Sequence, residues 1–404
     1  MNRLIAALAA LSLAPAALAQ DATATQEAAP APDVAALEGK IASLEEQVAE
    51  MKSDVSGLKR LKLSGYVQAR YAWQEATDYN ASPDAAPSQT NFFIRRGRLK
   101  AAYDAGWSQY VLQIDATPSG VSIKEGYATV KLPKIGALSG LAIDAGLQLF
   151  PFGYEVLVRS SSDLDLLERA RVTRFFLAGE YDLGVALRGA YGPVNFKVCV
   201  FNGNGIDAGQ TGLDNDNRKD VIGRVGYDLG FLTGGFSGWY GKTVDYGTAG
   251  DQEEDRVRFG ADAQVFLELL PIGGTAIKGE YVWGKTGIGN QTLTPASGST
   301  PADTTGGAGV NLGKTASGWY LLGTQNVGQY NQVAVRYEQF IPNHAASGTS
   351  NELEKELQVA VHTFIGGNYK LSAAWFHPLE FDRADGSDFD PKADQWIVQA
   401  QAKF

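Results

Sequence analysis

The sequence is poor in the side chains that build disulfide frameworks, metal sites and histidine-dependent active sites. Its 404 residues contain one cysteine, Cys199, and three histidines. A single cysteine excludes an intramolecular disulfide framework and a cysteine-based zinc site. The histidines, His344, His362 and His377, are not spaced three or four residues apart, so a histidine metal cluster is not expected. We therefore predict neither a metal nor a cofactor.

Long apolar runs and a positive net charge are missing too. Beyond the first 20 residues, no run approaches the roughly 20 apolar residues that a membrane-spanning helix needs. The formal net charge is −10, so the basic surface required for nucleic acid binding is absent, and we expect no nucleic acid partner. With 44% hydrophobic and 10% aromatic residues, however, the chain is too apolar to be disordered.

The first 20 residues have the parts of a secretory signal peptide. Arg3 gives a basic start, residues 4–18 are mostly apolar, and Ala17-Leu18-Ala19 supplies a small-x-small cleavage motif. We expect residues 1–20 to be removed on export. Residues 21–33, rich in Ala, Thr, Gln and Pro, then form a flexible leader.

Residues 34–60 carry a heptad pattern. Apolar side chains recur at alternating spacings of three and four residues, namely Val34, Leu37, Ile41, Leu44, Val48, Met51, Val55 and Leu58. This register, with a β-branched residue at every a position, predicts an α-helical coiled coil, which we place in the periplasm. The pattern favours self-association of identical chains. The alternative is a single helix lying against the body of its own chain.

From residue 61 the pattern changes to a strict alternation of apolar and polar side chains. Sixteen such segments, each about ten residues long, begin near residues 61, 91, 107, 122, 140, 183, 194, 219, 231, 256, 274, 316, 329, 355, 369 and 394. Ten residues suffice for a tilted strand to cross the hydrocarbon layer of a membrane. Aromatic residues near the segment ends, including Trp239 and Tyr320, suit interfacial girdles.

The connections between these segments alternate between short and long. The long set is 74–90, 151–182, 204–218, 243–255, 287–315, 342–354 and 379–393, and only 117–121 breaks the rule. Turns on one rim and loops on the other indicate an up-and-down barrel, whereas a β-sandwich does not sort its loops by parity. We therefore predict an all-β fold: a 16-stranded antiparallel transmembrane β-barrel over residues 61–404, behind the N-terminal coiled coil.

Four parts of this barrel segment resemble the phosphate-selective porin O and P family. They are Asn91-Phe92-Phe93-Ile94-Arg95-Arg96-Gly97-Arg98-Leu99, residues 150–155 with Leu166-Leu167-Glu168-Arg169, residues 200–205, and residues 318–320 with 335–338. The resemblance runs from about residue 61 to the C-terminus. It implies a trimeric porin of the Gram-negative outer membrane, with the third outer loop folded into the pore.

Strand parity points many charged side chains into the lumen. Arg96, Arg98 and Lys100 follow one another along one strand, and we expect them to form a pore-lining basic track together with Arg70. Further lumen charges are expected at Arg258, Lys278, Arg336 and Glu338. The alternative is that these are ordinary lumen residues, each screened by a neighbouring acid.

Connection 151–182 is the third on the long-loop rim and is rich in charge. If it folds inward, it narrows the lumen and brings opposite charges into one cross-section, a field that selects polar solutes. We expect Arg169, Arg171 and Arg174 to form the basic side of this constriction, with Asp163, Asp165 and Glu168 opposite. An external lid with solvated charges is the alternative.

The sequence thus predicts a porin for passive diffusion of small hydrophilic or ionic solutes, with anions such as phosphate among them. The acidic long connections argue against phosphate, because a phosphate funnel should be basic. Outer-membrane lipid and lipopolysaccharide are the expected surroundings. Two other functions were weighed: an envelope tether whose coiled coil contacts the cell wall, and a barrel enzyme. We disfavour the enzyme because we expect no histidine beside a serine in a rim strand.

Overall fold

The computed structural model describes residues 34–75, 88–118, 120–177, 179–203, 205, 217–247, 250–285, 315–342, 344, 353–382, 388–389 and 394–404. The expected signal peptide (1–20) and leader (21–33) lie outside these residues. The chain divides into two units, Met1–Leu58 and Lys59–Phe404.

The first unit contains helix α1 (Val34–Leu58), as the heptad pattern predicts. Four of its apolar side chains, Ile41, Leu44, Val48 and Met51, are 40 to 57% exposed. An exposed apolar stripe of this kind is the surface that self-association covers. The coiled coil itself stays a prediction. Among the described residues, no helix is both long and apolar enough to cross a membrane.

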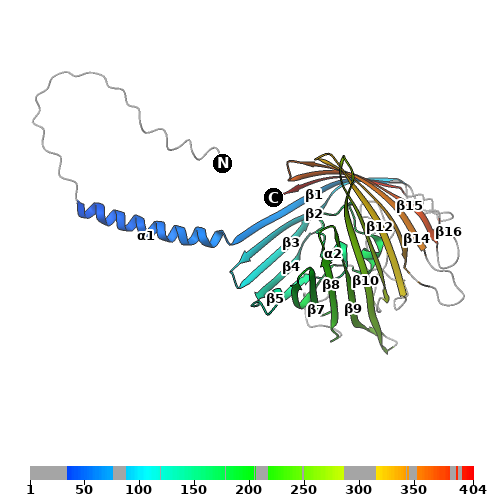
Figure 1. Cartoon of the computed structure of the whole chain (residues 1–404), viewed down its shortest axis with the longest axis horizontal. Helices are drawn as coiled ribbons and strands as arrows, with labels where there is room; N and C mark the ends of the chain where they lie inside the picture. The colour runs from blue at the N-terminus through cyan, green and yellow to red at the C-terminus, as the bar shows by residue number, and fades with distance from the viewer. Residues whose placement is uncertain are drawn as a thin grey trace, which may run out of the picture. The chain divides into compact units, whose positions relative to one another are not determined.

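The second unit is one antiparallel sheet closed into a barrel (Figure 1). Its described residues form sixteen long strands, β1 (Leu61–Gln74), β2 (Gln89–Asp104), β3 (Ser108–Thr117), β4 (Gly120–Lys131), β5 (Leu138–Leu149), β6 (Tyr181–Tyr191), β7 (Val194–Phe201), β8 (Asp220–Asp228), β9 (Leu232–Gly247), β10 (Gly250–Leu270), β11 (Gly273–Lys285), β12 (Thr315–Val327), β13 (Asn331–Ile341), β14 (Leu353–Ile365), β15 (Tyr369–Asp382) and β17 (Gln395–Lys403). The short β16 (Asp388–Phe389) pairs only with β15. The predicted sixteen-stranded barrel is confirmed.

The barrel closes where the last strand meets the first. β17 pairs with β1 from Tyr66↔Lys403 to Gln74↔Gln395, and β1 pairs on its other side with β2. The backbones of Gly65 and Phe404 exchange two hydrogen bonds of 3.1 and 3.0 Å at the end of this seam. Closure leaves no long strand with an open edge, as a bilayer requires.

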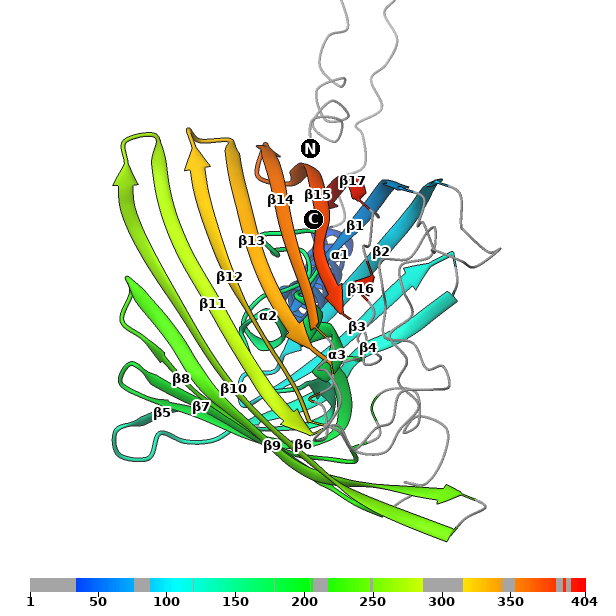
Figure 2. The same cartoon turned by 90° about the vertical axis from the view of Figure 1, so that its right-hand side faces the viewer.

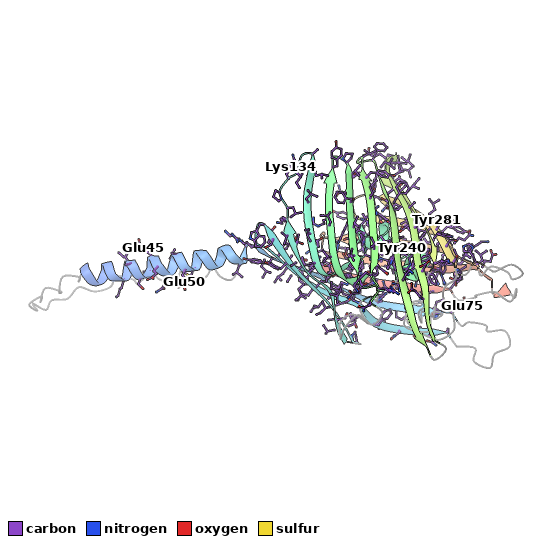
Figure 3. The ribbon with its side chains drawn as sticks, turned by 90° about the horizontal axis from the view of Figure 1, so that it is seen from below. Glu45, Glu50, Glu75, Lys134, Tyr240 and Tyr281 are labelled. Atoms are coloured by element: carbon purple, nitrogen blue, oxygen red, sulfur yellow. The ribbon has the colours of Figure 1, made fainter. Side chains whose placement is uncertain are left out.

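Alternating side chains divide the wall into an apolar outer face and a polar inner face. On β17, Trp396 and Val398 are 50 and 55% exposed, whereas Gln399 and Gln401 are buried. Tyr240 on β9 and Tyr281 on β11, both labelled in Figure 3, are likewise exposed. The outer face therefore resembles a lipid-facing surface, and the inner face presents charged and amide groups.

Two residues assigned above to the aromatic girdle were assigned wrongly. Trp239 and Tyr320 are 4 and 2% exposed and face the lumen. Each directly adjoins an outward aromatic residue, Tyr240 and Trp319, and neighbouring side chains of a strand point to opposite faces. Inside the barrel, the Trp239 ring packs against Phe150 and Phe152 in the connection between β5 and β6, and Tyr320 belongs to the same buried cluster.

This connection, L3 (residues 150–180), folds into the barrel and carries helices α2 (Tyr154–Leu157) and α3 (Arg171–Phe176), which Figure 2 shows within the ring of strands. Its apolar side chains, including Phe152, Val156 and Phe176, form a buried cluster with small and aromatic side chains of the wall. The hydrophobic core of the barrel unit thus lies inside the lumen, between L3 and the strands.

Candidate functional site

L3 enters the lumen through a glycine that the geometry requires. Gly153 has φ +68°, and its N–H donates to Ser237 Oγ at 3.0 Å. A Cβ at this position would collide with the carboxylate of Glu280. That carboxylate accepts a hydrogen bond from the N–H of Tyr154 (3.2 Å) and another from the Tyr320 hydroxyl (3.1 Å). A side chain at residue 153 would therefore displace the first anchor of L3.

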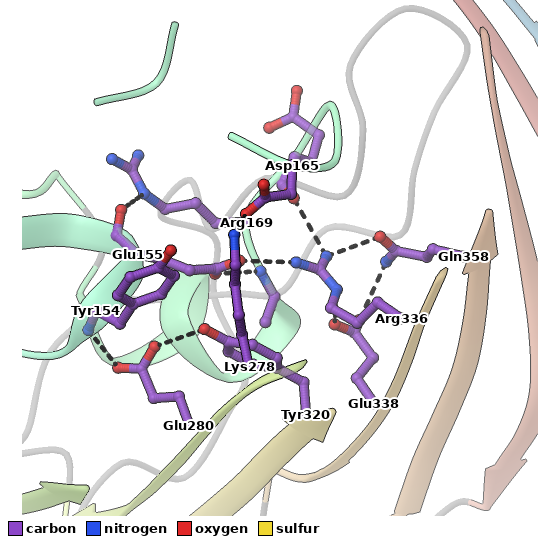
Figure 4. Close-up of polar contacts among 12 residues, drawn as sticks. Tyr154, Glu155, Asp165, Arg169, Lys278, Glu280, Tyr320, Arg336, Glu338 and Gln358 are labelled. Atoms are coloured by element: carbon purple, nitrogen blue, oxygen red, sulfur yellow. Dashed lines mark hydrogen bonds and ion pairs between the residues drawn. The ribbon is translucent and has the colours of Figure 1, made fainter. Parts of the chain in front are cut away.

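Arg336 on β13 forms the central anchor (Figure 4). Its guanidinium lies 2.8 Å from Glu155 of L3 and 3.2 Å from Glu338 of its own strand, and it donates to Gln358 at 2.7 Å. The second Glu155 oxygen accepts the N–H of Ala170 at 2.7 Å, immediately before α3. Because Arg336 is fully buried, these groups supply the charge compensation that water would otherwise give.

Glu168 is the second charged anchor. It pairs with Arg70 of β1 and, at 2.9 and 3.2 Å, with Arg95 of β2. Burial by itself would raise the Glu168 pKa, but the guanidinium groups of Arg95 and Arg70 outweigh it and hold the pKa well below its ordinary value. Arg70 also donates to the carbonyl of Leu167 at 2.7 Å.

The two aspartates of L3 pair with cations too. Asp165 lies between Lys278 of β11 (2.7 Å) and Arg159 of L3 (3.0 Å). Asp163 pairs with Lys403 at the end of β17, where both side chains are partly exposed. All three acids expected on one side of the constriction therefore contact wall cations.

The three expected basic residues of L3 follow these acids directly in the sequence. Arg169 pairs with Glu180 of L3. Arg171 reaches Glu354 (2.5 Å) and Glu356 (3.2 Å) on β14. Arg174 is in the last turn of α3. L3 charges of both signs thus pair with separate partners, and the constriction formed by the two sets stays a prediction.

The expected basic track lies on β1 and β2, but its members differ in environment. Arg96 is buried and lies 3.4 Å from the Gln68 side chain. Arg98 is buried between Asp115 (3.2 Å) and the Tyr181 hydroxyl (3.1 Å). Lys100 pairs with Glu125 at 2.5 Å, yet its side chain keeps 32% exposure. Arg258, another expected lumen charge, places its guanidinium 4.1 Å from the centre of the Trp239 ring.

Sequence parity missed Arg95, which is an anchor of L3. The register between β1 and β2 shifts at Gln68, so that Arg96 and Ile94 oppose consecutive residues and Arg95 is the extra residue of a β-bulge. The bulge turns Arg95 and Arg96 both toward the lumen. The sequence carries a sign of this bulge, because the outward positions 92, 94, 97 and 99 are spaced by two residues except between 94 and 97, where the spacing is three.

One expectation about serine and histidine is wrong. Ser317 Oγ on β12, at the long-loop rim, lies 2.8 Å from His344 Nε2. The pair is distant in sequence, so the spacing of residues gave no sign of it. Within the described residues, no carboxylate bonds to the His344 ring to complete a triad. The same residues contain no group of three or more His, Cys, Asp or Glu arranged to hold a metal ion.

The sequence matches no protein-family model and no curated protein. Solved structures do match. OprB of Pseudomonas putida has a TM-score of 0.58 at 10% identity, with 87% of this chain and 96% of that chain covered. The outer membrane channel DcaP of Acinetobacter baumannii scores 0.55 at 11% identity, covering 85% and 97%. OmpT, an outer membrane protein of Vibrio cholerae solved in a trimer form, scores 0.53 at 13% identity, covering 85% and 99%. At such identities the likeness shows the fold alone, the antiparallel β-barrel of sixteen strands.

Proposed function

We propose that the protein is an outer-membrane porin through which small hydrophilic or ionic solutes diffuse passively. The observation that carries this proposal is the sorting of side chains, with an apolar outer face around a lumen of charged and amide groups. Such a barrel is stable in lipid and wet inside. L3, held in the lumen by the Arg336 and Glu168 anchors, is the element that narrows the passage.

We further propose that the basic track of Arg70, Arg96, Arg98 and Lys100 gives the lumen its anion-facing wall. Its support is the partial exposure of Lys100, while Arg70, Arg96 and Arg98 stabilise the wall and L3 behind it. The acidic long connections oppose this preference at the mouth. A weak anion preference follows, with phosphate one of several anions that pass.

The setting proposed for this pore is the Gram-negative outer membrane, with lipid and lipopolysaccharide around the barrel and the short-turn rim toward the periplasm. A homotrimer is proposed, in line with the trimer form of Vibrio cholerae OmpT. The exposed stripe of α1 supports a periplasmic coiled coil that joins the copies. The same helix is the segment that would contact the cell wall if the protein also tethers the envelope.

Planar-bilayer recording of the purified full-length protein tests the proposal. We expect stable single-channel openings, with currents that grow in proportion to salt concentration, as in a wet pore. The Lys100→Gln variant, which removes the exposed charge of the track, should shift the reversal potential in a KCl gradient toward potassium. Folded, heat-modifiable protein that gives no openings would refute the pore, whereas unchanged ion preference in the variant would refute the role of the track.

A further inference from the structure

L3 leaves the two halves of the lumen wall unequally covered. Its side chains and backbone make polar contacts with β1 and β2, with β9, β10, β11, β13, β14 and β15, and with β17. Several inward cations on these strands are hidden, with side-chain exposures of 0% for Arg336 and 4% for Lys278, whereas Lys100 of β2 keeps 32%. On the opposite wall, where L3 makes apolar contacts such as that of Phe150 with Phe201 of β7, Arg188 of β6 and Lys197 of β7 keep 38 and 17% exposure.

Three cations lie side by side on that opposite wall. Arg188 pairs in register with Lys197, and Lys197 pairs in register with Arg224 of β8. The three positions form one line across three neighbouring strands, which we name the basic row. Like charges directly opposite each other destabilise a sheet. The basic row is therefore an arrangement that folding alone does not favour, and such violations concentrate at functional sites.

The acids that compensate the basic row lie on the wall on either side of it, on β5 and β10. Asp144 of β5 is 3.0 Å from Arg188 and 3.9 Å from Lys197, and Thr129 donates to it at 2.7 Å. Its side chain is only 4% exposed. At the other end of the row, Asp262 pairs with Arg224 at 2.5 Å and is 1% exposed. Water in the lumen thus meets ammonium and guanidinium groups, while the carboxylates stay covered.

We propose that the basic row is a further selectivity element of the pore beside the basic track, and that its exposed members, Arg188 and Lys197, contact a passing anion. This rests on the proposed diffusion function and specifies its solute class: small hydrated anions, such as chloride or inorganic phosphate. Guanidinium and ammonium groups replace part of an anion's hydration shell by charge-assisted hydrogen bonds. Three cations against two covered acids leave the row with one positive charge in excess.

The test measures reversal potentials in KCl gradients for wild type, Lys197→Gln and Arg188→Gln/Lys197→Gln. A unit charge roughly 8 Å away across water raises the local chloride concentration and lowers the local potassium concentration about twofold each, so Lys197→Gln should lower the chloride-to-potassium permeability ratio about fourfold and the double variant about 16-fold. Lys197→Arg should keep the ratio. The matched control is Lys134→Gln, which removes an exposed lysine from the turn between β4 and β5 (Figure 3) and should leave the ratio unchanged.

A second readout separates a selective row from a structural one. Because Lys197→Gln removes repulsion from its two register neighbours, the variant should resist thermal unfolding at least as well as wild type. Inorganic phosphate should block chloride current in wild type and block it more weakly in the double variant. Normal conductance with an unchanged permeability ratio would overturn the role of the row and leave the pore standing. Absence of channels in wild type would instead overturn the pore and the inference with it.

Discussion

The Glu168→Gln variant should release L3 from the lumen wall. The substitution keeps the shape of the side chain but removes the carboxylate that compensates Arg70, whose side chain is 0% exposed. Removing one partner of a buried ion pair costs about 3–5 kcal/mol, since the other charge stays buried. Such a cost raises the equilibrium constant for L3 opening by about two to four orders of magnitude.

Limited proteolysis with trypsin measures this opening. Arg169 and Arg171 of L3 are side chains at which trypsin cleaves, and cleavage of a transiently open segment follows the population of the open form. The matched control is Asp163→Asn, whose partner Lys403 is partly exposed, so the loss should be at most about 1 kcal/mol. Adding Arg70→Met to Glu168→Gln should restore much of the protection. Equal cleavage rates in Glu168→Gln and Asp163→Asn would refute the anchor.

Three further predictions concern pH, the seam and the helix. The pKa of Glu168 in the folded protein lies well below its ordinary 4.5, so the stabilisation that Glu168 gives is present above pH 4.5 and is lost only as pH falls through the depressed pKa. Protection of L3 from trypsin should therefore be equal at pH 7 and pH 5. A loss of protection by pH 5 would contradict this prediction. Gly65→Ala should lower the free energy of unfolding of the barrel by about 1–3 kcal/mol, because the added Cβ would lie 2.5 Å from the Phe404 ring. The control Gly323→Ala, where the added Cβ meets open space, should leave the stability unchanged. The temperature at which each variant loses its heat-modifiable gel mobility compares the two. Deleting residues 34–58 should leave single-channel conductance unchanged and weaken the oligomer in mild detergent, and an unchanged oligomer would contradict the coiled coil.

The barrel could be predicted from sequence because its determinants are local. Alternation along each strand reports which side chains meet lipid and which meet water, and the parity of connection lengths reports the two rims. The same rule fails at a bulge. At Arg95 one extra residue reverses the facing of every position before it, so the anchor of Glu168 was missed.

The pairing of charges across the lumen could not be read from sequence. Arg336 and Glu155 are 181 residues apart, and which wall cation meets which L3 acid depends on how the loop turns within the barrel. Parity correctly predicts that Lys278 and Arg336 point inward, but it does not predict which strands L3 contacts. Arg188 and Lys197 face each other across the short β6–β7 hairpin, but the place of Arg224 in the basic row depends on the register of β7 with β8.

Cysteine accessibility during single-channel recording tests the central claim most directly, namely that water and ions pass along the wall at Arg188 and Lys197. In a Cys199→Ala background, Arg188→Cys introduces a thiol on that wall, and Gln358→Cys introduces one behind L3, where Gln358 is fully buried. We predict that a charged methanethiosulfonate reagent reduces current in abrupt steps for Arg188→Cys and has no effect on Gln358→Cys. Current reduction at residue 358 with none at residue 188 would contradict the account.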